Sequence, residues 1–303
     1  MKRPAFTHDR YASMAYVVLV YQLAVALAWS TFGAFDLAPL WAMSTGLFVS
    51  ALLCFVAMLP VNNGSVFDPW WSVLPPFAAL YFLTLVADDG MTARQLAVLV
   101  VVVAWSLRLT LNWFRDYPGL QHEDFRYLDL YEKTPLPRWA VRLLLVDLFP
   151  AGQVVLGCLP LYPALVLGGG GFGALDLLAL AVGLLATLIE LVADEQMRNF
   201  IRTRADGDNM CSGLWRYSRH PNYFGEILFW VSLFLFGLAA APGWWWTGVG
   251  AVAMILMFVF ASVPMMDERS MARRPGYADY ARRTSALVPW PPRRGLASDY
   301  FGH

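Results

Sequence analysis

The sequence predicts an all-α integral membrane protein, a polytopic bundle of seven or eight transmembrane helices with no Rossmann domain. Of its 303 residues, 58% are hydrophobic and only 15% are charged, whereas a soluble domain carries about 25% charged residues. The apolar residues come in runs of about 20, the length that crosses a bilayer as a helix. No Walker loop, G-x-S-x-G or H-E-x-x-H motif occurs, so any nucleotide would be held by membrane helices and their loops.

Eight apolar runs are the candidate spans. In chain order they cover residues 11–32, 39–60, 69–87, 93–114, 138–165, 174–200, 221–240 and 244–264. The first run follows a basic N-terminus, but it lacks the cleavage site of a signal peptide and is long enough to span, so we interpret it as a retained helix. The third run contains Pro75 and Pro76, which break or kink a helix. Whether this run crosses decides between seven and eight spans, and so the side on which the N-terminus lies.

The distribution of basic residues predicts the orientation of the chain. With eight spans and the N-terminus inside, 19 of the 22 lysines and arginines fall in inner segments, and Arg94 alone falls in an outer loop. Lysine and arginine collect on the cytoplasmic side of membrane proteins. We therefore expect the C-terminus and the segments 115–138 and 198–219 on the cytoplasmic side.

Composition also argues against several kinds of site. The formal net charge is zero, which argues against a nucleic-acid partner. Cys54, Cys158 and Cys211 lie far apart and form no disulfide or metal framework. The four histidines show no metal-ligand spacing. We therefore expect no metal site, and each cysteine is expected to pack as a small apolar residue.

The most informative stretch is R-H-P-N-Y-F-G-E, from Arg219 to Glu226, where a polar loop runs into an apolar span. Polar side chains at a membrane boundary are costly unless they bind something. Pro221 suits the first turn of a helix, and Asn222 and Glu226, four residues apart, then share one face. Arg219 and His220 beside this helix N-terminus form a natural anion site. The stretch therefore predicts a phosphate-bearing ligand at the cytoplasmic membrane surface.

Two rows of polar residues lie within the predicted spans. Helical spacing places on one face of the fourth run Trp105, Arg108, Asn112 and Arg115. The same spacing places on one face of the sixth run Glu190, Asp194 and Arg198. Snorkelling to the interface explains Arg115 better than the deeper Arg108, which we interpret as facing a polar cavity. For the acidic row two interpretations stay open, a structural ion ladder and the lining of a polar site.

The inner loops carry further candidates. Residues 119–131 fit an interfacial amphipathic helix, or a loop that closes over a nucleotide with Arg126 on a phosphate and Tyr127 on a ring. Asp68 before Pro69 fits a helix cap, yet it is also the best carboxyl group on the inner side of the first four spans.

The segment after the last span is basic. Residues 266–277 fit a basic cluster that binds anionic lipid or the phosphate of a ligand. The tail from Thr284, with P-W-P-P at 289–292, is expected to be extended rather than helical.

Together these motifs resemble the steroid 5α-reductase family, in its bacterial branch. The resemblance covers roughly residues 60–295 and rests on segments that stand in this sequence as W-R-Y-S-R-H-P-N-Y-F-G-E (215–226), N-N with D-P-W (62–70), W-S-L-R (105–108), E-D-F-R-Y (123–127), Asp194, and R-P-G-Y (274–277) through S-A-L-V-P (285–289). The long form of the central motif is specific. R-H-P-x-Y-x-G alone is shared with isoprenylcysteine carboxyl methyltransferases.

The resemblance implies an NADPH-dependent reductase of the bacterial inner membrane. Such an enzyme moves hydride to the C=C bond of a lipid-like enone, foremost the Δ4 bond of a 3-ketosteroid. Residues 1–137 would form the apolar substrate chamber, and residues 138–303 would form the reductase-like domain that binds the cofactor. The expected partners are a hydrophobic small molecule and membrane lipids. We expect a monomer, although the sequence leaves the oligomeric state open.

In that family a carboxylate and a tyrosine hold the ketone oxygen. Here Trp105 stands where the tyrosine is expected, and a tryptophan N–H cannot transfer a proton at neutral pH, so the proton donor stays open. The catalytic set that we predict is Asp68, Asn63, Asn62 and Trp105. The cofactor-binding set comprises Arg108, Arg115, Asp124, Arg126, Tyr127, Asp194, Arg198, Tyr217, Arg219, His220, Asn222, Tyr223, Glu226 and Arg269.

Two other functions compete with this prediction. An isoprenylcysteine-type methyltransferase would use S-adenosylmethionine, but such enzymes are usually shorter and lack the reductase-like N-terminal motifs. A transporter would line its path with Arg108 and Asp194. It would also show broken helices in paired halves, of which the sequence gives no sign.

Overall fold

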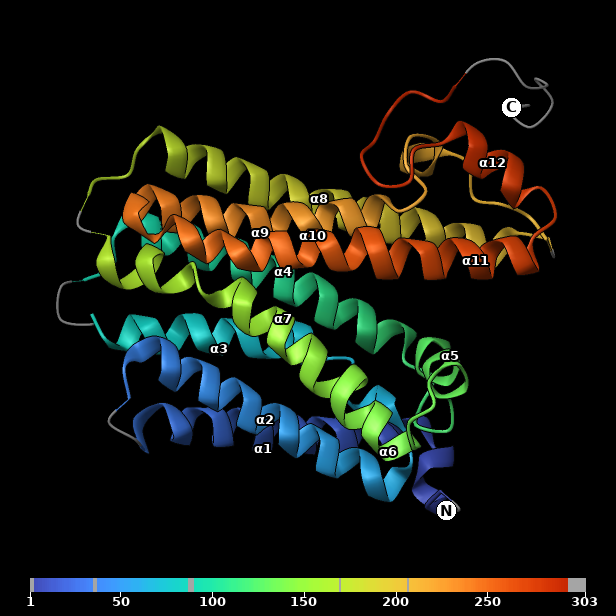
Figure 1. Ribbon diagram of the computed structural model, residues 1–303, viewed down its shortest axis with the longest axis horizontal. Coiled ribbons are helices and arrows are strands. Elements are labelled where there is room, and N and C mark those ends of the chain that lie inside the picture. Colours follow the sequence, from blue (N-terminus) through green and yellow to red (C-terminus); the bar gives the residue numbers. More distant parts are fainter. Residues whose placement is uncertain (1–2, 35–36, 87–89, 169, 206, 294–303) are drawn as a thin grey trace.

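The computed structural model describes residues 3–34, 37–86, 90–168, 170–205 and 207–293, which form an elongated bundle of helices (Figure 1). Seven stretches are long and apolar enough to cross a membrane, which confirms the predicted all-α membrane fold. Five of these stretches are single long helices, namely α1 (Arg10–Ala34), α2 (Pro39–Val61), α4 (Ala93–Asp116), α8 (Ala174–Thr203) and α9 (Pro221–Ala240). The other two, Arg138–Leu167 and Pro242–Arg273, are built from several helices in succession.

These two composite stretches change helical pitch along their length. The first contains α6 (Arg138–Val141), a π-helical turn (Arg142–Leu148), α7 (Phe149–Cys158) and a second π-helical turn (Pro163–Leu167). The second contains a 3-10 turn (Pro242–Gly248), α10 (Val249–Met257), a π-helical turn (Phe258–Ser262) and α11 (Val263–Arg273). Pro163 begins one π turn, and Pro150 and Pro264 each follow the end of another by two residues. A proline removes one bond of the helical ladder, and a local change of pitch accommodates that loss.

The third apolar run forms α3 (Trp70–Thr84), a helix of only 15 residues. It runs beside α1, α2 and α4 (Figure 1), but at about 1.5 Å per residue it is shorter than the hydrocarbon core. Pro75 and Pro76 lie inside it without ending it. Pro76 cannot bond to the carbonyl of Ser72 four residues earlier, and the Ser106 hydroxyl of α4 donates to that carbonyl at 2.6 Å instead. Contact with a neighbouring helix therefore replaces the missing bond.

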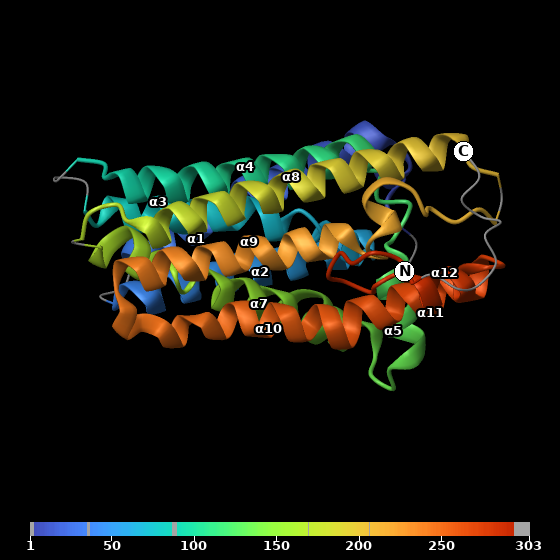
Figure 2. The ribbon, with the colours of Figure 1, turned by 90° about the horizontal axis from the view of Figure 1, so that it is seen from above.

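Glycines allow the helices of the C-terminal half to approach closely. α8 lies between α4 and α9 (Figure 2), and a Cβ atom at Gly183 of α8 would lie 2.5 Å from Val101 of α4 and 2.7 Å from Ser232 of α9. At the contact of α10 with α7, a Cβ atom at Gly250 would lie 2.1 Å from the Leu156 carbonyl oxygen. Such approach of backbones is typical of membrane helix packing.

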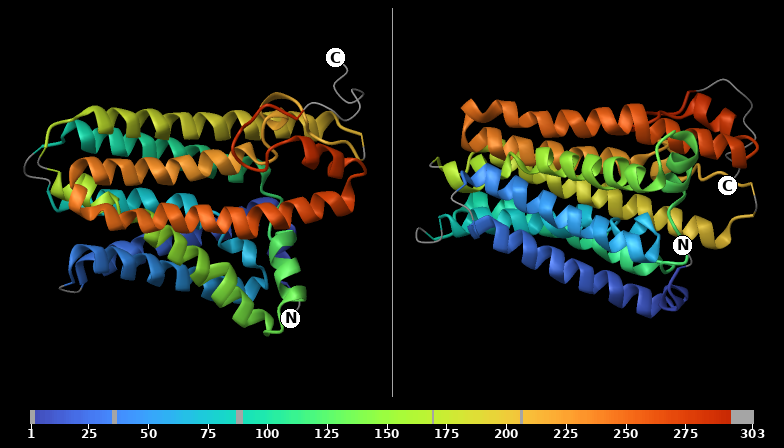
Figure 3. Two further views of the ribbon diagram at one scale, coloured as in Figure 1. Left: turned by 45° about the horizontal axis from the view of Figure 1, so that its top comes forward. Right: turned by 60° about the horizontal axis from the view of Figure 1, so that its bottom comes forward.

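The polar segments gather at one end of the bundle (Figure 3). There lie α5 (Phe125–Lys133) and α12 (Tyr277–Arg283), together with the end of α11. Of the segment 119–131, which was expected to form an amphipathic helix, residues 125–131 are helical as part of α5. Beyond Arg283 the described residues contain no helix, as predicted, and residues 294–303 of the predicted tail lie outside the described part. An isolated bridge between Ser218 and Ser285 ties this tail to the loop before α9.

We predict that Gly250→Ala destabilises the protein by about 1–3 kcal/mol, because the added methyl group meets backbone atoms that cannot move aside cheaply. Thermal unfolding in detergent, followed by tryptophan fluorescence, measures this. The matched control is Gly152→Ala in α7, where a Cβ atom meets nothing within 4 Å and alanine favours the helix. Equal melting temperatures for both variants would contradict the proposed close contact.

Candidate functional site

An open cavity of about 200 Å³ lies at the polar end of the bundle, beside the loop between α2 and α3. Residues from this loop, from the end of α4 and from the segment before α5 line it. They are Ser65, Asp68, Trp113, Asp116, Tyr117, Pro118, His122, Glu123 and Asp124. Two of the predicted site residues, Asp68 and Asp124, therefore border a common space.

Asp68 is held by a tyrosine of α5. The Tyr127 hydroxyl donates a hydrogen bond to Asp68 Oδ1 at 2.5 Å. Burial, and after it the charge of Asp124, raises the pKa of Asp68 to about 7, and burial also raises the pKa of Tyr127. Near neutral pH this pair therefore retains protons that it can share with an acceptor in the cavity. The sequence had suggested a nucleotide ring as the partner of Tyr127, whereas the structure pairs it with the predicted catalytic carboxyl.

Asn62 and Asn63 build the wall of this site and do not line the cavity. Asn63 Oδ1 accepts from the Ser65 backbone N–H at 2.8 Å, and Asn63 Nδ2 donates to the carbonyls of Leu120 and His122 at 2.8 and 2.9 Å. Asn62 ends α2 with a φ of 49°, a conformation that asparagine tolerates better than most residues. Every polar atom of the buried Asn63 amide thus binds backbone, which leaves none for a substrate.

Glu123 fixes the segment that carries Asp124 and Tyr127, and it was not among the predicted site residues. Its carboxylate accepts from the Gly64 backbone N–H at 2.7 Å and from the Tyr131 hydroxyl at 2.8 Å. It also pairs with Arg3 at 3.1 Å and with Arg142 at 3.4 Å. The side chain is 3% exposed. One buried carboxylate therefore joins the N-terminus, the 62–69 loop, α5 and the stretch that begins with α6.

Trp105 does not lie in the cavity beside Asp68. Its ring stacks on Phe229 of α9, with centroids 4.0 Å apart, and its N–H donates to Glu226 Oε2 at 3.0 Å. Trp230 donates to the other oxygen of Glu226, also at 3.0 Å. The indole N–H that sequence reasoning assigned to a ketone oxygen is thus bound to the carboxylate of the R-H-P-N-Y-F-G-E motif.

The two polar rows of the fourth and sixth runs face each other. Arg108 Nη1 donates to Asp194 at 3.0 Å, Arg108 Nη2 binds Glu190, and Glu226 lies 3.7 Å away. Nearer the polar end, Asn112 donates to Asp194 at 2.6 Å and Arg198 donates to Asn112 at 3.2 Å. These contacts form an ion ladder between α4, α8 and α9.

Toward the polar end of the bundle, this ladder reaches the protein surface. Arg198 also pairs with Asp116 at 2.9 Å, and Arg115 and Arg198 both bind Glu195. Arg108, Arg115 and Arg198, which were predicted to contact the cofactor, are therefore all neutralised by carboxylates of the protein. In the structure their ion pairs connect α4 with α8, and their contact with a cofactor stays a prediction.

Arg219 and His220 meet at a carboxylate that sequence reasoning missed, Asp267 of α11. Arg219 binds it through two nitrogens at 2.6 and 3.3 Å, and His220 Nε2 lies 3.0 Å from Oδ1. The Tyr277 hydroxyl donates to the same oxygen at 2.5 Å. One signal in the sequence could have revealed Asp267. It is an acidic residue at the cytoplasmic end of the last apolar run, and Arg219 precedes the apolar run before it.

Other predicted residues lie at the start of α5 or contact it from α11. Asp124 caps α5, and its carboxylate binds the Arg126 guanidinium through two bonds of 2.9 Å. Burial acts to raise the pKa of Asp124, but the Arg126 charge lowers it overall. Arg269 lies over the Phe125 ring, 3.4 Å from its centroid.

Residues at the start of α9 complete the site. Tyr223 stacks on His220, with centroids 5.3 Å apart. Tyr217 is 42% exposed, and its carbonyl accepts from the Trp290 backbone N–H at 2.9 Å. Asn222 Oδ1 is buried and has no hydrogen-bond partner among the described residues. An unpaired buried amide oxygen is costly, which makes Asn222 the residue of the motif with a free group to offer a ligand.

In the described part of the chain, no group of three or more His, Cys, Asp or Glu side chains is arranged to hold a metal ion.

Comparison with known proteins shows the family of this chain. Residues 54–284 match the model of a family described as "Protein of unknown function (DUF1295)", and the chain belongs to this family. An uncharacterized protein of Schizosaccharomyces pombe is 27% identical over 256 residues, which cover 75% of this chain and 73% of the yeast protein. No solved structure matches the chain.

We predict that Asp68→Asn gains stability relative to the wild type as the pH rises. The folded-state pKa of Asp68, about 7, lies above its ordinary value, so the wild type loses stability between about pH 4 and about pH 7, where the unfolded chain is ionised and the folded carboxyl is not. Melting temperatures in detergent at about pH 5 and about pH 8 test this. Glu132→Gln, at an exposed carboxyl of α5, should give the same difference from the wild type at both pH values. If the melting temperature of Asp68→Asn also differed from that of the wild type by the same amount at both pH values, the raised pKa of Asp68 would be contradicted.

We predict that Arg108→Gln destabilises the protein by about 3–5 kcal/mol, because it leaves three carboxylates without their cation. Arg108→Lys, which keeps the charge, should recover part of this loss. Thermal unfolding of both variants in detergent measures the difference. Equal losses in the two would show that shape, and not charge, decides.

Proposed function

We propose that the protein is an NADPH-dependent membrane reductase that transfers hydride to the C=C bond of a lipid-like enone, with the Δ4 bond of a 3-ketosteroid as the first substrate to test. The observation that supports this most is the Asp68–Tyr127 pair beside an open cavity. The sequence resemblance calls for a carboxyl group and a tyrosine at the ketone oxygen. Tyr127 is the tyrosine beside Asp68. In this proposal it takes the role that the resemblance gave to the position of Trp105.

The chemistry of the pair suits this role. An enone accepts hydride more readily when hydrogen bonds stabilise the negative charge that develops on its oxygen. Asp68, with a pKa of about 7, and Tyr127, with a raised pKa, are both protonated in a large fraction of molecules at neutral pH. Asp68, which lines the cavity, can donate a hydrogen bond to the carbonyl oxygen and supply the proton that the reduced product needs, and Tyr127, which donates to Asp68, can return a proton to it.

The surroundings of the pair suit an apolar substrate. Phe67 and Trp70, which flank the 68–69 segment, are fully buried and stack with centroids 5.2 Å apart. Tyr21 of α1 donates to the carbonyls of Val66 and Phe67 at 3.0 Å, so the loop rests on the apolar core of α1 to α3. Asp68 is thus held where the apolar interior meets the polar end of the bundle. In this proposal the apolar side keeps bulk water away from one face of the substrate's carbonyl group.

The residues of the motif also fit a nicotinamide cofactor, although not through every arginine that the sequence suggested. Arg108 and Arg219 are neutralised by carboxylates and act as positioning residues. Asn222 offers the unpaired buried oxygen described above. Bound NADPH would supply the hydride, and Asn222 with the neighbouring Tyr223 would hold it at the motif. In this proposal the cofactor lies on the cytoplasmic side of a bacterial inner membrane, in line with the excess of basic residues at that end.

We predict that detergent-purified protein consumes NADPH when given testosterone or progesterone, and that the product is heavier by two hydrogen atoms. Asp68→Asn and Tyr127→Phe should each reduce the rate by about 100-fold or more, because each removes a group that stabilises or protonates the enolate. Binding of NADPH should persist in both variants. Glu132→Gln is the matched control and should keep the rate.

Two other outcomes separate the alternatives. Stabilisation by S-adenosylmethionine and not by NADPH would overturn the reductase in favour of a methyltransferase. Turnover that survives in both Asp68→Asn and Tyr127→Phe would place the chemistry elsewhere in the protein.

A further inference from the structure

One carboxyl oxygen in the ion ladder between α4, α8 and α9 receives no hydrogen bond. Glu190 of α8 is 2% exposed, and its Oε1 atom has no hydrogen-bond partner among the described residues. Its other oxygen, Oε2, accepts from Arg108 Nη2. Both oxygens of the neighbouring Glu226 are also served, because the indole N–H groups of Trp105 and Trp230 donate to them at 3.0 Å. A buried oxygen without a donor is costly, so Glu190 Oε1 calls for a partner.

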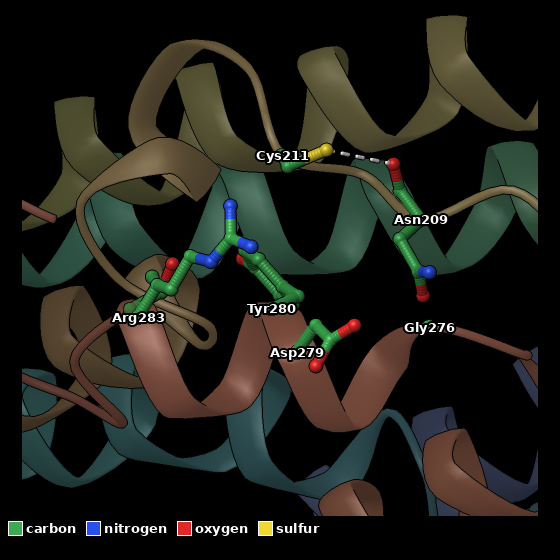
Figure 4. Close-up of a pocket in the computed structure, with 7 residues that line it drawn as sticks. Asn209, Cys211, Gly276, Asp279, Tyr280 and Arg283 are labelled. Atoms are coloured by element: carbon green, nitrogen blue, oxygen red, sulfur yellow. Dashed lines mark hydrogen bonds between the residues drawn. The ribbon is translucent and has the colours of Figure 1, made fainter. Parts of the chain in front are cut away.

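Solvent provides such a partner at the polar end of the bundle. A small hollow lies there between the loop after α8 and α12 (Figure 4), and it holds about 30 Å³. That volume has room for little more than a water molecule. Water can therefore serve the Thr284 hydroxyl and the Asn209 amide oxygen, two atoms at this hollow without a partner in the described part of the protein. Glu190 lies deeper, between packed helices.

The charges around Glu190 do not balance when every acid is ionised. The helix α4 contributes one cation, Arg108, whereas α8 contributes Glu190 and Asp194 and α9 contributes Glu226. The helices α7 and α10 and the turns that adjoin them at the outer end also pack against α9, and they contain no charged residue. Three carboxylates around one guanidinium would leave two negative charges unpaired inside the bundle, which is costly in a medium of low dielectric constant.

The next cations toward the polar end do not correct this imbalance. Arg198 and Arg115 bind Asp116 and Glu195, so two further acids accompany two further cations. The turn that packs against α8 at this end carries Arg216, which is exposed. The excess of negative charge therefore stays with the three inner acids.

Glu190 and Glu226 are the two inner acids that are placed to share a proton. Arg108 Nη2 contacts both of them. Gly225 lets Glu190 lie against the motif helix, since a Cβ atom at Gly225 would be 2.4 Å from Glu190 Cγ. Asp194, in contrast, has two donors on one oxygen, and its side chain is 21% exposed. Neighbouring carboxyl groups in a dry site retain a proton, because two like charges so close together repel each other.

We infer that Glu190 and Glu226 form a proton-binding site inside the membrane, with one proton held on Glu190 Oε1. This proton gives the oxygen the hydrogen that no protein group supplies, and it removes one of the two unpaired charges. Release of the proton would add a negative charge where α8 meets the first turns of α9, the helix of the R-H-P-N-Y-F-G-E motif. The site goes beyond the proposed function, since it needs neither cofactor nor substrate.

Infrared spectroscopy of the full chain in lipid nanodiscs tests the site, because a protonated carboxyl group has a C=O stretching band that an ionised one lacks. At neutral pH, Glu190→Gln and Glu226→Gln should each lose the band of one protonated carboxyl group relative to the wild type. Glu132→Gln, at an exposed carboxyl of α5, is the control and should keep the whole signal. An unchanged signal in Glu190→Gln would overturn the proposal and leave a bound water as the partner of Oε1.

Thermal unfolding distinguishes a bound proton from an ordinary ion pair. Glutamine has the shape of a protonated glutamic acid, so Glu190→Gln should melt at the temperature of the wild type at about pH 6. From there to about pH 9 the wild type should lose stability relative to Glu190→Gln, because the folded wild type holds a proton that the unfolded chain has released. A difference that stays constant with pH, or a Glu190→Gln variant as unstable as Arg108→Gln, would overturn the proposal.

Discussion

The positive charge of Arg108 is the constraint on which the C-terminal half of the bundle depends. A cation inside the hydrocarbon region is tolerated only when anionic groups surround it. Here Glu190 and Asp194 of α8 and Glu226 of α9 provide them, so α4, α8 and α9 have one relative arrangement that satisfies the charge. Trp105 and Trp230 then complete the hydrogen bonding of Glu226. The position of the motif helix therefore follows from a charge that lies outside the motif.

The same principle organises the polar end, where Glu123 and Asp267 each collect donors from several segments. Arg219, the arginine of the motif, is among these donors, and its other bonds go to the carbonyls of Ala281 and Thr284, so its guanidinium is already bound within the protein. The groups that the protein leaves uncommitted are fewer and mostly neutral. Among the described residues they include the oxygen of Asn222 and the hydroxyls of Tyr117 and Thr284. This contrast separates the residues that shape the site from those with capacity to bind.

Hydrophobic run length was sufficient to predict the long helices, because the bilayer imposes this signal directly on the sequence. Residue spacing also predicted which side chains share a face, as with Arg108 and Asn112. Spacing within one segment could not predict the partner on another segment. Trp105 was therefore assigned to a substrate although Glu226 binds it, and Asp267 was missed. The fate of Pro75 and Pro76 likewise depended on the Ser106 hydroxyl, which is remote in sequence.

The position of the contacts of Arg219 has a consequence for biosynthesis. Its side chain binds Asp267 and the carbonyls of Ala281 and Thr284, and its backbone N–H donates to the Ser285 carbonyl. All of these partners are translated long after the motif itself. Until residues 267–285 have been made, the motif loop has none of these partners, even if every preceding span is already inserted. The spans before the motif can therefore insert into the membrane before the contacts of the candidate site form.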